Sequence, residues 1–468
     1  MKIVWAVIAL FAVRFIFWAW SYPLQDADLA WQAVLGLNVL THHAIPQQLG
    51  AETFTAPRAP WVPQEWLFST AVAAAFADGT FWMLAVITTL AAVAALVIVA
   101  YHSRYRGASD FAIACVTLCT GVAMMQSFGV RAQVFGWPLL AAMLVCFESE
   151  GALQFFAIPL VAVWANLHAG VMLAPALAIA RAAGITIEEP MLNARVRRAA
   201  LLAGGVSVAV LCTPFGWKLP MYAVSLFNSP FKSTISEWQP ADLTYYSFCL
   251  GVLPLVAAAI WLGVVYPGRR WHDGILFAVM LGMAFFAVRS LSLCAITIAP
   301  MVAVALTRII PQKHRLNTLF QERMPRAVLA VATLGCGIAL GATMLRTRDT
   351  TVLPQRAVAT LAGMPGIHRV YCEDFAWCSL ALRHANLQTF IDGRCDPFPI
   401  AVWNAYVRIE KLTPQWDSTL GDYGVDAVIA GAANPIAQAL SVRGDWRVAY
   451  RDGRFALFVR RSQHTARR

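Results

Sequence analysis

Residues 81–101 of this chain read FWMLAVITTLAAVAALVIVAY and contain no charged side chain. About 20 helical residues cross the roughly 30 Å hydrocarbon core of a bilayer, so this stretch predicts a transmembrane helix. Comparable apolar runs recur along most of the sequence. The pattern indicates a polytopic membrane protein.

The composition agrees with a membrane protein. Of 468 residues, 59% are hydrophobic and 13% are charged, whereas an ordinary soluble domain carries about 25% charge. A soluble enzyme, a disulfide scaffold and a disordered tail protein are therefore excluded. Part of the net charge of +11 lies in short loops between apolar runs, which favours a membrane surface over nucleic acid as its partner.

We expect eleven membrane spans, of which the fourth and fifth are short for a full crossing. They are residues 3–21, 81–101, 110–128, 134–147, 152–166, 168–186, 199–213, 244–266, 273–289, 291–307 and 327–345. Residues 64–77 are apolar but shorter and bounded by Pro63 and Asp78. This length predicts an interfacial helix.

Loop charge orients the chain, because cytoplasmic loops carry an excess of Lys and Arg. With a cytoplasmic N-terminus, the inner segments carry Lys2, Arg104, Arg106, Arg195, Arg197, Arg198, Arg269, Arg270, Arg308, Lys313, Arg315, Arg323 and Arg326, and the outer ones carry Arg58, Arg131, Lys218, Lys232 and Arg289. Thirteen cations against five predict an extracytoplasmic tail. Residues 1–21 also fit a cleaved signal peptide, but the long apolar stretch and Arg14 favour a first span.

The tail differs from the rest of the chain. Strand-like runs at 367–372, 388–391, 425–430, 446–450 and 455–460 alternate with helical patterns at 375–385, 400–412 and 434–442. This alternation predicts a small α/β domain. We therefore expect an all-α membrane domain at 1–345, with a first outer loop at 22–80, followed by an extracytoplasmic α/β domain at 346–468. Cys372, Cys378 and Cys395 lie in this tail, and their odd number leaves the pairing open.

Two carboxylates directly follow the first span, in Leu24-Gln25-Asp26-Ala27-Asp28. Such a pair can bind Mg²⁺ or Mn²⁺ through its oxygens, or divide into a general base and a hydrogen-bonding partner. The alternative is that they cap a helix over 29–40. Ionisable groups near a membrane are functional candidates by default, so Asp26 and Asp28 are the candidate catalytic residues.

Further polar residues gather on the predicted outer face. The candidate substrate-binding residues there are Glu65, Arg131, Gln133, Asn166, His168, Lys218, Glu237 and Arg289. Arg suits phosphate recognition, but the two arginines also fit snorkelling to lipid headgroups. His168 fits either a phosphate contact or a structural hydrogen bond to a neighbouring helix.

The tail adds two candidates, in Ile391-Asp392-Gly393-Arg394-Cys395-Asp396 after a predicted strand. Loops at strand ends often carry binding groups, so Asp392 and Arg394 are candidates to contact a sugar or the membrane domain. A local ion pair beside a glycine turn explains them equally well.

Several segments together resemble bacterial membrane proteins related to the GT-C glycosyltransferase superfamily. They are Asp26-Ala27-Asp28, Trp31 to Pro46, Phe54-Thr55-Ala56-Pro57, Trp61, Glu65-Trp66-Leu67, Arg131-Ala132-Gln133, Trp164-Ala165-Asn166-Leu167-His168, Pro214-Phe215-Gly216-Trp217, Ser236-Glu237-Trp238-Gln239-Pro240 and Ile391-Asp392-Gly393-Arg394. The sequence departs from that pattern at Ala132, Ala169 and Thr213.

The resemblance implies a multi-pass enzyme of the bacterial inner membrane. Its donor would be a sugar linked to polyprenyl phosphate, and its acceptor an extracytoplasmic glycan, lipid or protein. Asp26 or Asp28 would serve as general base or metal ligand in an inverting displacement. Because such a donor carries its own activation, no nucleotide site is needed, and no phosphate-binding loop occurs in the sequence.

Two other functions stay open. A transporter or lipid flippase shares the multi-span plan, although no internal repeat is visible. A non-catalytic assembly or scaffold protein, whose outer domain binds a partner, fits the departures from the superfamily pattern.

Overall fold

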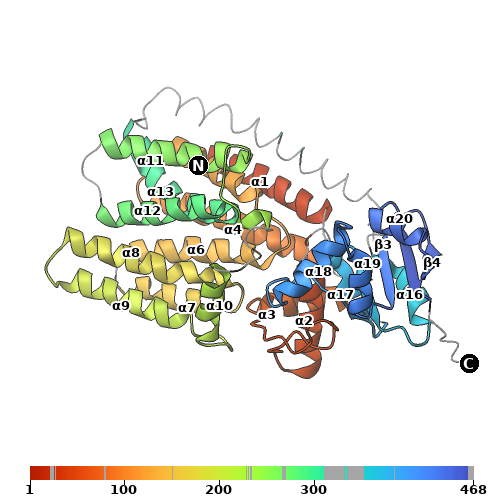
Figure 1. Ribbon diagram of the computed structural model, residues 1–468. Helices are drawn as coiled ribbons and strands as arrows, with labels where there is room; N and C mark the ends of the chain where they lie inside the picture. The colour runs from red at the N-terminus through yellow and green to blue at the C-terminus, as the bar shows by residue number, and fades with distance from the viewer. Residues whose placement is uncertain are drawn as a thin grey trace, which may run out of the picture. The chain divides into compact units, whose positions relative to one another are not determined.

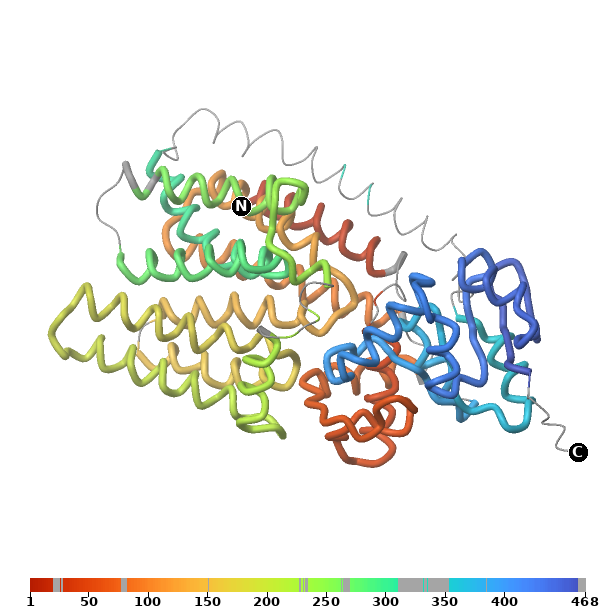
Figure 2. Tube along the Cα trace, viewed as in Figure 1, coloured from red at the N-terminus to blue at the C-terminus, as the bar shows by residue number. Residues whose placement is uncertain are grey.

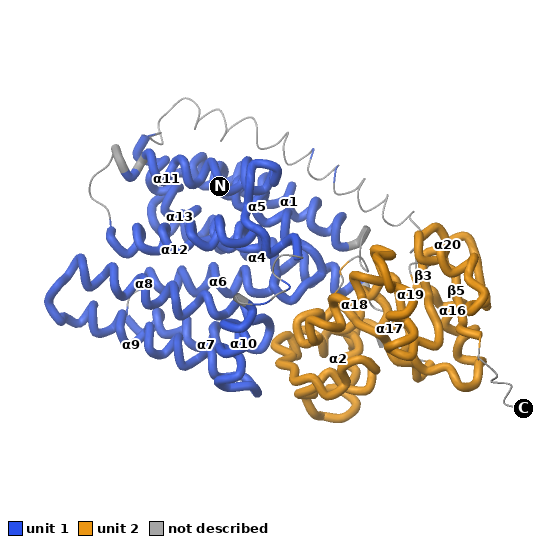
Figure 3. Tube along the Cα trace, in the orientation of Figure 1, with its two compact units in different colours: residues 1–23, 80–346 blue, residues 24–79, 347–468 orange. Residues whose placement is uncertain are grey.

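The computed structural model describes residues 1–21, 26, 28–77, 81–149, 151–227, 229, 231, 235–265, 270–309, 331, 335, 353–383 and 385–461. They divide into two compact units (Figure 3). Unit 1 comprises residues 1–23 and 80–346, and unit 2 comprises residues 24–79 and 347–468. The predicted eleventh span at 327–345 and the loop cations Lys232, Arg269, Lys313, Arg315, Arg323 and Arg326 lie outside the described residues, except that 331 and 335 are described.

Unit 1 is helical, as the apolar runs predict. Its elements are α1 (Lys2–Ser21), α4 (Phe81–Tyr105), α5 (Asp110–Met125), α6 (Ala132–Glu148), η1 (Gly151–Phe156), α7 (Ala157–Trp164), η2 (Ala169–Met172), α8 (Leu173–Glu188), α9 (Ala194–Ala209), α10 (Lys218–Phe227), η4 (Ser236–Trp238), η5 (Ser247–Val252), α11 (Leu253–Val265), α12 (Trp271–Phe286), η6 (Val288–Ser290) and α13 (Leu291–Ile309).

Four helices among the described residues are long and apolar enough to cross a membrane. They are Lys2–Ala19, Trp82–Tyr105, Ala169–Glu188 and Val288–Ile309. Six shorter apolar helices accompany them, one of which, Trp66–Phe76, belongs to unit 2. The chain is a multi-pass membrane protein.

Helix packing in unit 1 relies on close backbone approach (Figures 1 and 2). Helix α4 packs against α1 and α6, and α8 packs against α9 and α12. A Cβ added at Gly184 in α8 would overlap the backbone of His272 in α12. Small residues allow such approach where no hydrophobic effect drives membrane helices together.

The loops of unit 1 sort into two ends of the bundle. At one end Arg106 pairs with Asp273, and Arg270 donates to Glu148 at the last residue of α6 over 3.0 Å. Arg131, at the other end of α6, belongs to a separate polar group. This sorting follows the alternation of inner and outer segments that the sequence predicts.

Unit 2 is an α/β domain whose elements come from two distant parts of the chain. They are α2 (Leu29–His42), α3 (Trp66–Ala77), α16 (Gln355–Ala362), β1 (Arg369–Cys372), α17 (Phe375–Arg383), β2 (Gln388–Thr389), α18 (Ile400–Glu410), α19 (Trp416–Asp422), β3 (Ala427–Gly431), α20 (Pro435–Ser441), β4 (Trp446–Arg451) and β5 (Phe455–Arg460). The predicted sheet in the tail is confirmed. Helices α16 and α19 were not predicted, because both are short and neither begins with a side chain that caps it.

The sheet has the strand order β2-β1-β3-β5-β4. Strands β2, β1 and β3 are parallel, and β5 is antiparallel to β3 and β4. Successive β3 residues enter opposite cores, Val428 on one face and Ala427 and Ile429 on the other. The period of two that places side chains on alternate faces of a strand therefore builds two layers of helices around the sheet.

The first outer loop is part of this domain. The backbone N–H of Thr389 in β2 donates to the Glu52 carbonyl over 2.8 Å, and the N–H of Phe54 donates back to Thr389 over 3.3 Å. Leu49 and Ala56 are buried in the same core as the tail. The loop thus covers the edge of the sheet, whereas the hydropathy pattern predicts it as part of the membrane domain.

Cys372 and Cys378 form a disulfide that joins the end of β1 to α17. Cys395 remains a thiol. The pairing that the sequence left open is therefore between the two cysteines nearest in sequence.

Candidate functional site

Three predicted site residues of unit 1 meet in one cluster, with an arginine between the other two. Arg289, in the η6 turn before α13, places Nη2 3.3 Å from His168 Nε2 and 3.5 Å from Gln133 Oε1. Its guanidinium lies 5.8 Å from the centre of the Trp238 ring, a cation–π distance. The three residues come from the starts of α6, η2 and α13, and the fold brings them together.

The ring of His168 has a defined orientation. Its Nδ1 accepts the backbone N–H of Gly170 over 2.9 Å at the start of η2. A neutral imidazole then carries its proton on Nε2, the nitrogen that faces Arg289. His168 and Arg289 thus bring two N–H groups to one place, an arrangement that suits an oxygen anion.

A second ion pair lies at the same end of the bundle. Arg131, which precedes α6, donates to Glu237 in η4. Burial acts to raise the pKa of Glu237, but the charges of Arg131 and Arg289 overcome it and hold that pKa below its usual value. Glu237 is therefore ionised at neutral pH and compensates two cations.

The other two unit 1 candidates differ from one another. The Asn166 amide donates to the carbonyls of Ala162 and Cys212, over 2.9 and 2.8 Å, and so joins the turn after α7 to the segment that follows α9. Lys218 is exposed at the first residue of α10, which packs against η2 beside His168.

The carboxylate pair lies at the start of α2 in unit 2. Asp26 Oδ1 accepts the backbone N–H of Asp28 over 3.0 Å. Asp28 Oδ1 accepts the indole N–H of Trp31 over 2.9 Å, and its side chain makes no capping hydrogen bond to the helix. The Asp28 side chain therefore does not cap α2, which was the alternative interpretation, and is held instead by Trp31, one turn further along the helix.

Glu65 is buried where α2 meets α3. Its Oε2 accepts the amide of Gln32 over 2.5 Å, and its Oε1 accepts that of Gln64 over 3.2 Å. The carboxylate also precedes the first turn of α3, where the helix dipole favours negative charge. Glu65 thus joins the two helices of the first outer loop.

Asp392 and Arg394 form a buried pair. Arg394 Nε lies 2.9 Å from Asp392 Oδ1, and Nη2 lies 2.5 Å from Oδ2. Asp392 is 0% exposed, and Arg394 Nη1 donates to the Leu49 carbonyl over 2.9 Å. This geometry supports the alternative of a local ion pair, extended by a bond to the first outer loop.

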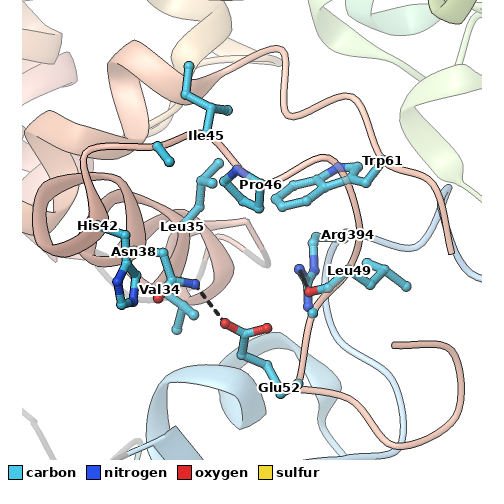
Figure 4. A pocket seen from close by; sticks show the side chains of 13 residues that line it. Val34, Leu35, Asn38, His42, Ile45, Pro46, Leu49, Glu52, Trp61 and Arg394 are labelled. Carbon is cyan, nitrogen blue, oxygen red and sulfur yellow. Dashed lines mark hydrogen bonds between the residues drawn. The ribbon is translucent and has the colours of Figure 1, made fainter. Parts of the chain in front are cut away.

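A pocket of about 300 Å³ opens beside this ion pair (Figure 4). One wall holds Asn38 and Glu52, whose side chains are joined by a 2.6 Å hydrogen bond, and another holds Trp61 and Arg394. The pocket is built entirely within unit 2. It combines an aromatic ring with amide, carboxylate and guanidinium groups.

Trp31 and Trp61 are the residues of this region whose contacts sequence reasoning missed. Both are buried, and their ring centres are 5.7 Å apart in an edge-to-face arrangement. The signal for the hydrogen bond between Trp31 and Asp28 is their spacing, because residues three positions apart at the start of a helix lie on the same face.

Metal-ligand chemistry occurs at two places among the described residues. Asp26 and Asp28 carry carboxylate oxygens, the kind of ligand that Mg²⁺ takes. Glu148, His272 and Asp273, at the other end of the unit 1 bundle, bring ligand atoms within 4.8 Å of one another. Arg270 and Arg106 bind these carboxylates, so this second group is an ion-pair network.

No model of a known protein family and no curated protein matches the sequence. Solved structures do match. Archaeal oligosaccharyltransferase AglB from Archaeoglobus fulgidus, in complex with an inhibitory peptide and a dolichol-phosphate, aligns with a TM-score of 0.62 at 11% identity, over 98% of this chain and 74% of its own. A complex of the oligosaccharyltransferase from that organism with Zn and sulfate gives 0.60 at 12% identity, over 92% and 68%.

ArnT from Cupriavidus metallidurans bound to undecaprenyl phosphate gives a TM-score of 0.54 at 14% identity, and the match covers 98% of both chains. At these identities the likeness concerns the fold. The fold is GT-C-like, which confirms the expectation drawn from the sequence motifs.

Proposed function

We propose, on the premise of this GT-C-like fold, that the chain is a membrane glycosyltransferase that uses a sugar linked to polyprenyl phosphate. The observation that carries the proposal is the pair of N–H groups that His168 and Arg289 present 3.3 Å apart. The matched ArnT is bound to undecaprenyl phosphate and the matched AglB to a dolichol-phosphate. A lipid phosphate is therefore the anion we assign to this place.

The phosphate is the leaving group of the reaction. As the bond from the sugar to the phosphate breaks, negative charge develops on the phosphate oxygens. Fixed N–H donors and cations stabilise such charge more in the transition state than in the ground state. Arg289 and His168 provide these donors, and Glu237, which pairs with Arg131, compensates the charge of both arginines.

Asp28 is the proposed general base. A carboxylate can take the proton from an acceptor hydroxyl as it attacks the anomeric carbon, a contribution of typically 10²–10⁴-fold. A single displacement inverts the anomeric centre. Asp26 supports this role, because it accepts the backbone N–H of Asp28.

Asp26 and Asp28 are also the residues that would hold Mg²⁺ or Mn²⁺. When bound, the ion would supply positive charge that favours an oxygen anion at these carboxylates. Two carboxylates do not complete the coordination of such an ion, so its remaining ligands would be further oxygen atoms, water among them.

We place the tail and the first outer loop outside the cytoplasm of a bacterial inner membrane. The excess of cations on the segments predicted to lie inside supports this orientation. The disulfide between Cys372 and Cys378 supports it as well, because disulfides persist in oxidising compartments. The acceptor, a glycan, lipid or protein, would then meet the donor on that side.

The test is sugar release from a panel of undecaprenyl-phosphate hexoses and pentoses by the full-length protein in nanodiscs. Asp28→Asn keeps an oxygen that can accept the Trp31 N–H, so the local structure is retained while the base is lost. We expect transfer to fall about 10²–10⁴-fold, against less than tenfold for the matched Asp26→Asn. Full activity of well-folded Asp28→Asn would refute the assignment of the base.

A further inference from the structure

A continuous series of side-chain contacts in unit 2 begins at the tail. Arg394 binds both oxygens of Asp392 and donates to the Leu49 carbonyl. Its side chain is 5% exposed and that of Asp392 is 0% exposed. A planar guanidinium that is bound on two edges and buried has a fixed orientation.

The series continues through two tryptophans. The Arg394 guanidinium lies 4.8 Å from the centre of the Trp61 ring. Trp61 then contacts Trp31 edge-to-face, with an interplanar angle of 75°. Both residues are 7% exposed and pack with Leu35 in one apolar cluster, so displacement of one ring moves the other.

The series ends on the carboxylate that the proposed function treats as the base. The indole N–H of Trp31 donates to Asp28 Oδ1 over 2.9 Å. The Asp28 side chain makes no capping bond to the backbone of α2.

Helix α2 contacts the tail at a second place, besides the contacts through Trp31 and Trp61. There, Arg383 Nη1 donates to the Val34 carbonyl over 3.0 Å. Burial raises the pKa of the Cys395 thiol, and the charges of Asp396 and Asp28 raise it further. Asp28 therefore lies near the loop that carries the Asp392–Arg394 pair.

We propose that Arg394 is a positioning residue for Asp28. Its ion pair with Asp392 fixes Trp61, Trp61 fixes Trp31, and the Trp31 indole holds the Asp28 carboxylate in its working orientation. This inference rests on the proposed function for the role of Asp28. It assigns to the tail domain a part in catalysis that involves no contact with substrate.

The experiment compares two arginines under the same substitution. Arg394→Lys keeps the positive charge but removes the planar guanidinium that binds Asp392 and the Leu49 carbonyl and lies over the Trp61 ring. The matched control is Arg443→Lys, because Arg443 binds Asp417 over 2.6 Å and Asp445 over 2.9 Å, and lies 5.9 Å from the Trp416 ring. Trp31→Phe keeps a ring and removes the N–H that reaches Asp28.

We expect Arg394→Lys and Trp31→Phe each to lower kcat about 10- to 100-fold, with the donor KM changed less than twofold. The double variant should be no slower than the slower single variant, since both act on one carboxylate. Arg443→Lys should leave kcat unchanged and combine additively with Trp31→Phe. Additive effects of Arg394→Lys and Trp31→Phe, or a change in KM alone, would overturn the proposal.

A second measurement does not depend on activity. Full-length protein labelled with 5-fluorotryptophan gives fluorine resonances that Trp31→Phe and Trp61→Phe assign. Arg394→Lys should shift the resonances of both Trp61 and Trp31, and Arg443→Lys should shift neither. If the protein transfers no sugar, the proposed function fails while this readout still decides the positioning; an unmoved Trp31 resonance in Arg394→Lys refutes the positioning itself.

Discussion

Replacement of Arg289 by Gln tests the assigned phosphate site with a magnitude that follows from the structure. Arg289 Nη2 lies 3.3 Å from His168 Nε2, and the side chain is partly exposed, so a ligand can reach it. A hydrogen bond to a charged group contributes about 1.5–3 kcal/mol. Its loss should weaken binding of undecaprenyl phosphate about 10- to 150-fold.

The assay is a titration of the full-length protein in nanodiscs with undecaprenyl phosphate, followed by native mass spectrometry. Arg308→Gln is the matched control, because Arg308 lies in the last turn of α13 while Arg289 lies in the turn that precedes the same helix. Arg308→Gln should leave the affinity unchanged. An Arg289→Gln variant that binds as tightly as the wild type would refute the reasoning.

Two further predictions concern stability. Burial raises the pKa of Glu410 to about 7, despite the hydrogen bond from Tyr371. Between about pH 4.5 and pH 7 the folded state therefore keeps a proton that the unfolded state releases. The stability of the fold should fall as the pH rises through this range. Glu410→Gln should flatten this dependence of the unfolding midpoint between pH 5 and pH 8; an unchanged slope would contradict it. Gly36→Ala should destabilise the folded protein by about 1–3 kcal/mol, because the new Cβ overlaps the Ser69 carbonyl. Gly204→Ala should not destabilise it, because the space around Gly204 is open. Equal unfolding midpoints for the two variants would refute this prediction.

The sequence predicted the helical nature of unit 1 and the five strands of the tail, because both have a strong local signal, while the number of membrane spans stays a prediction. Long apolar runs indicate helices in a bilayer without reference to partners, and the tail strands are bounded by turns. Helix α19 begins without a capping side chain, so no local start signal indicates it, whereas the equally short α20 begins with Asn434 and Pro435.

The sequence indicates part of the polar cluster in unit 1, while its role stays a prediction. Gln133, His168 and Arg289 lie at span ends, where polar residues are costly, and they do meet in the structure. Asp392 and Arg394 were chosen for their position after a strand, but their buried pairing depends on Leu49, distant in sequence. A contact of that kind is set by the three-dimensional fold.

The membership of the first outer loop in unit 2 also escaped prediction. Hydropathy indicates that residues 24–79 form a loop between two spans, but it does not indicate which part of the chain this loop packs against. The loop pairs with β2 through backbone hydrogen bonds, and such bonds are indifferent to side-chain type. This is why the partner of an exposed sheet edge is hard to read from composition.

The most direct test of the account is the fate of the lipid-linked sugar. Purified full-length protein in proteoliposomes is supplied with undecaprenyl-phosphate hexoses and pentoses, and the lipids are quantified by mass spectrometry. We predict loss of one donor with stoichiometric appearance of undecaprenyl phosphate and of sugar on an acceptor or water. Intact donor that merely changes leaflet, as a flippase would produce, or donor that stays untouched, as with a scaffold protein, would contradict the account.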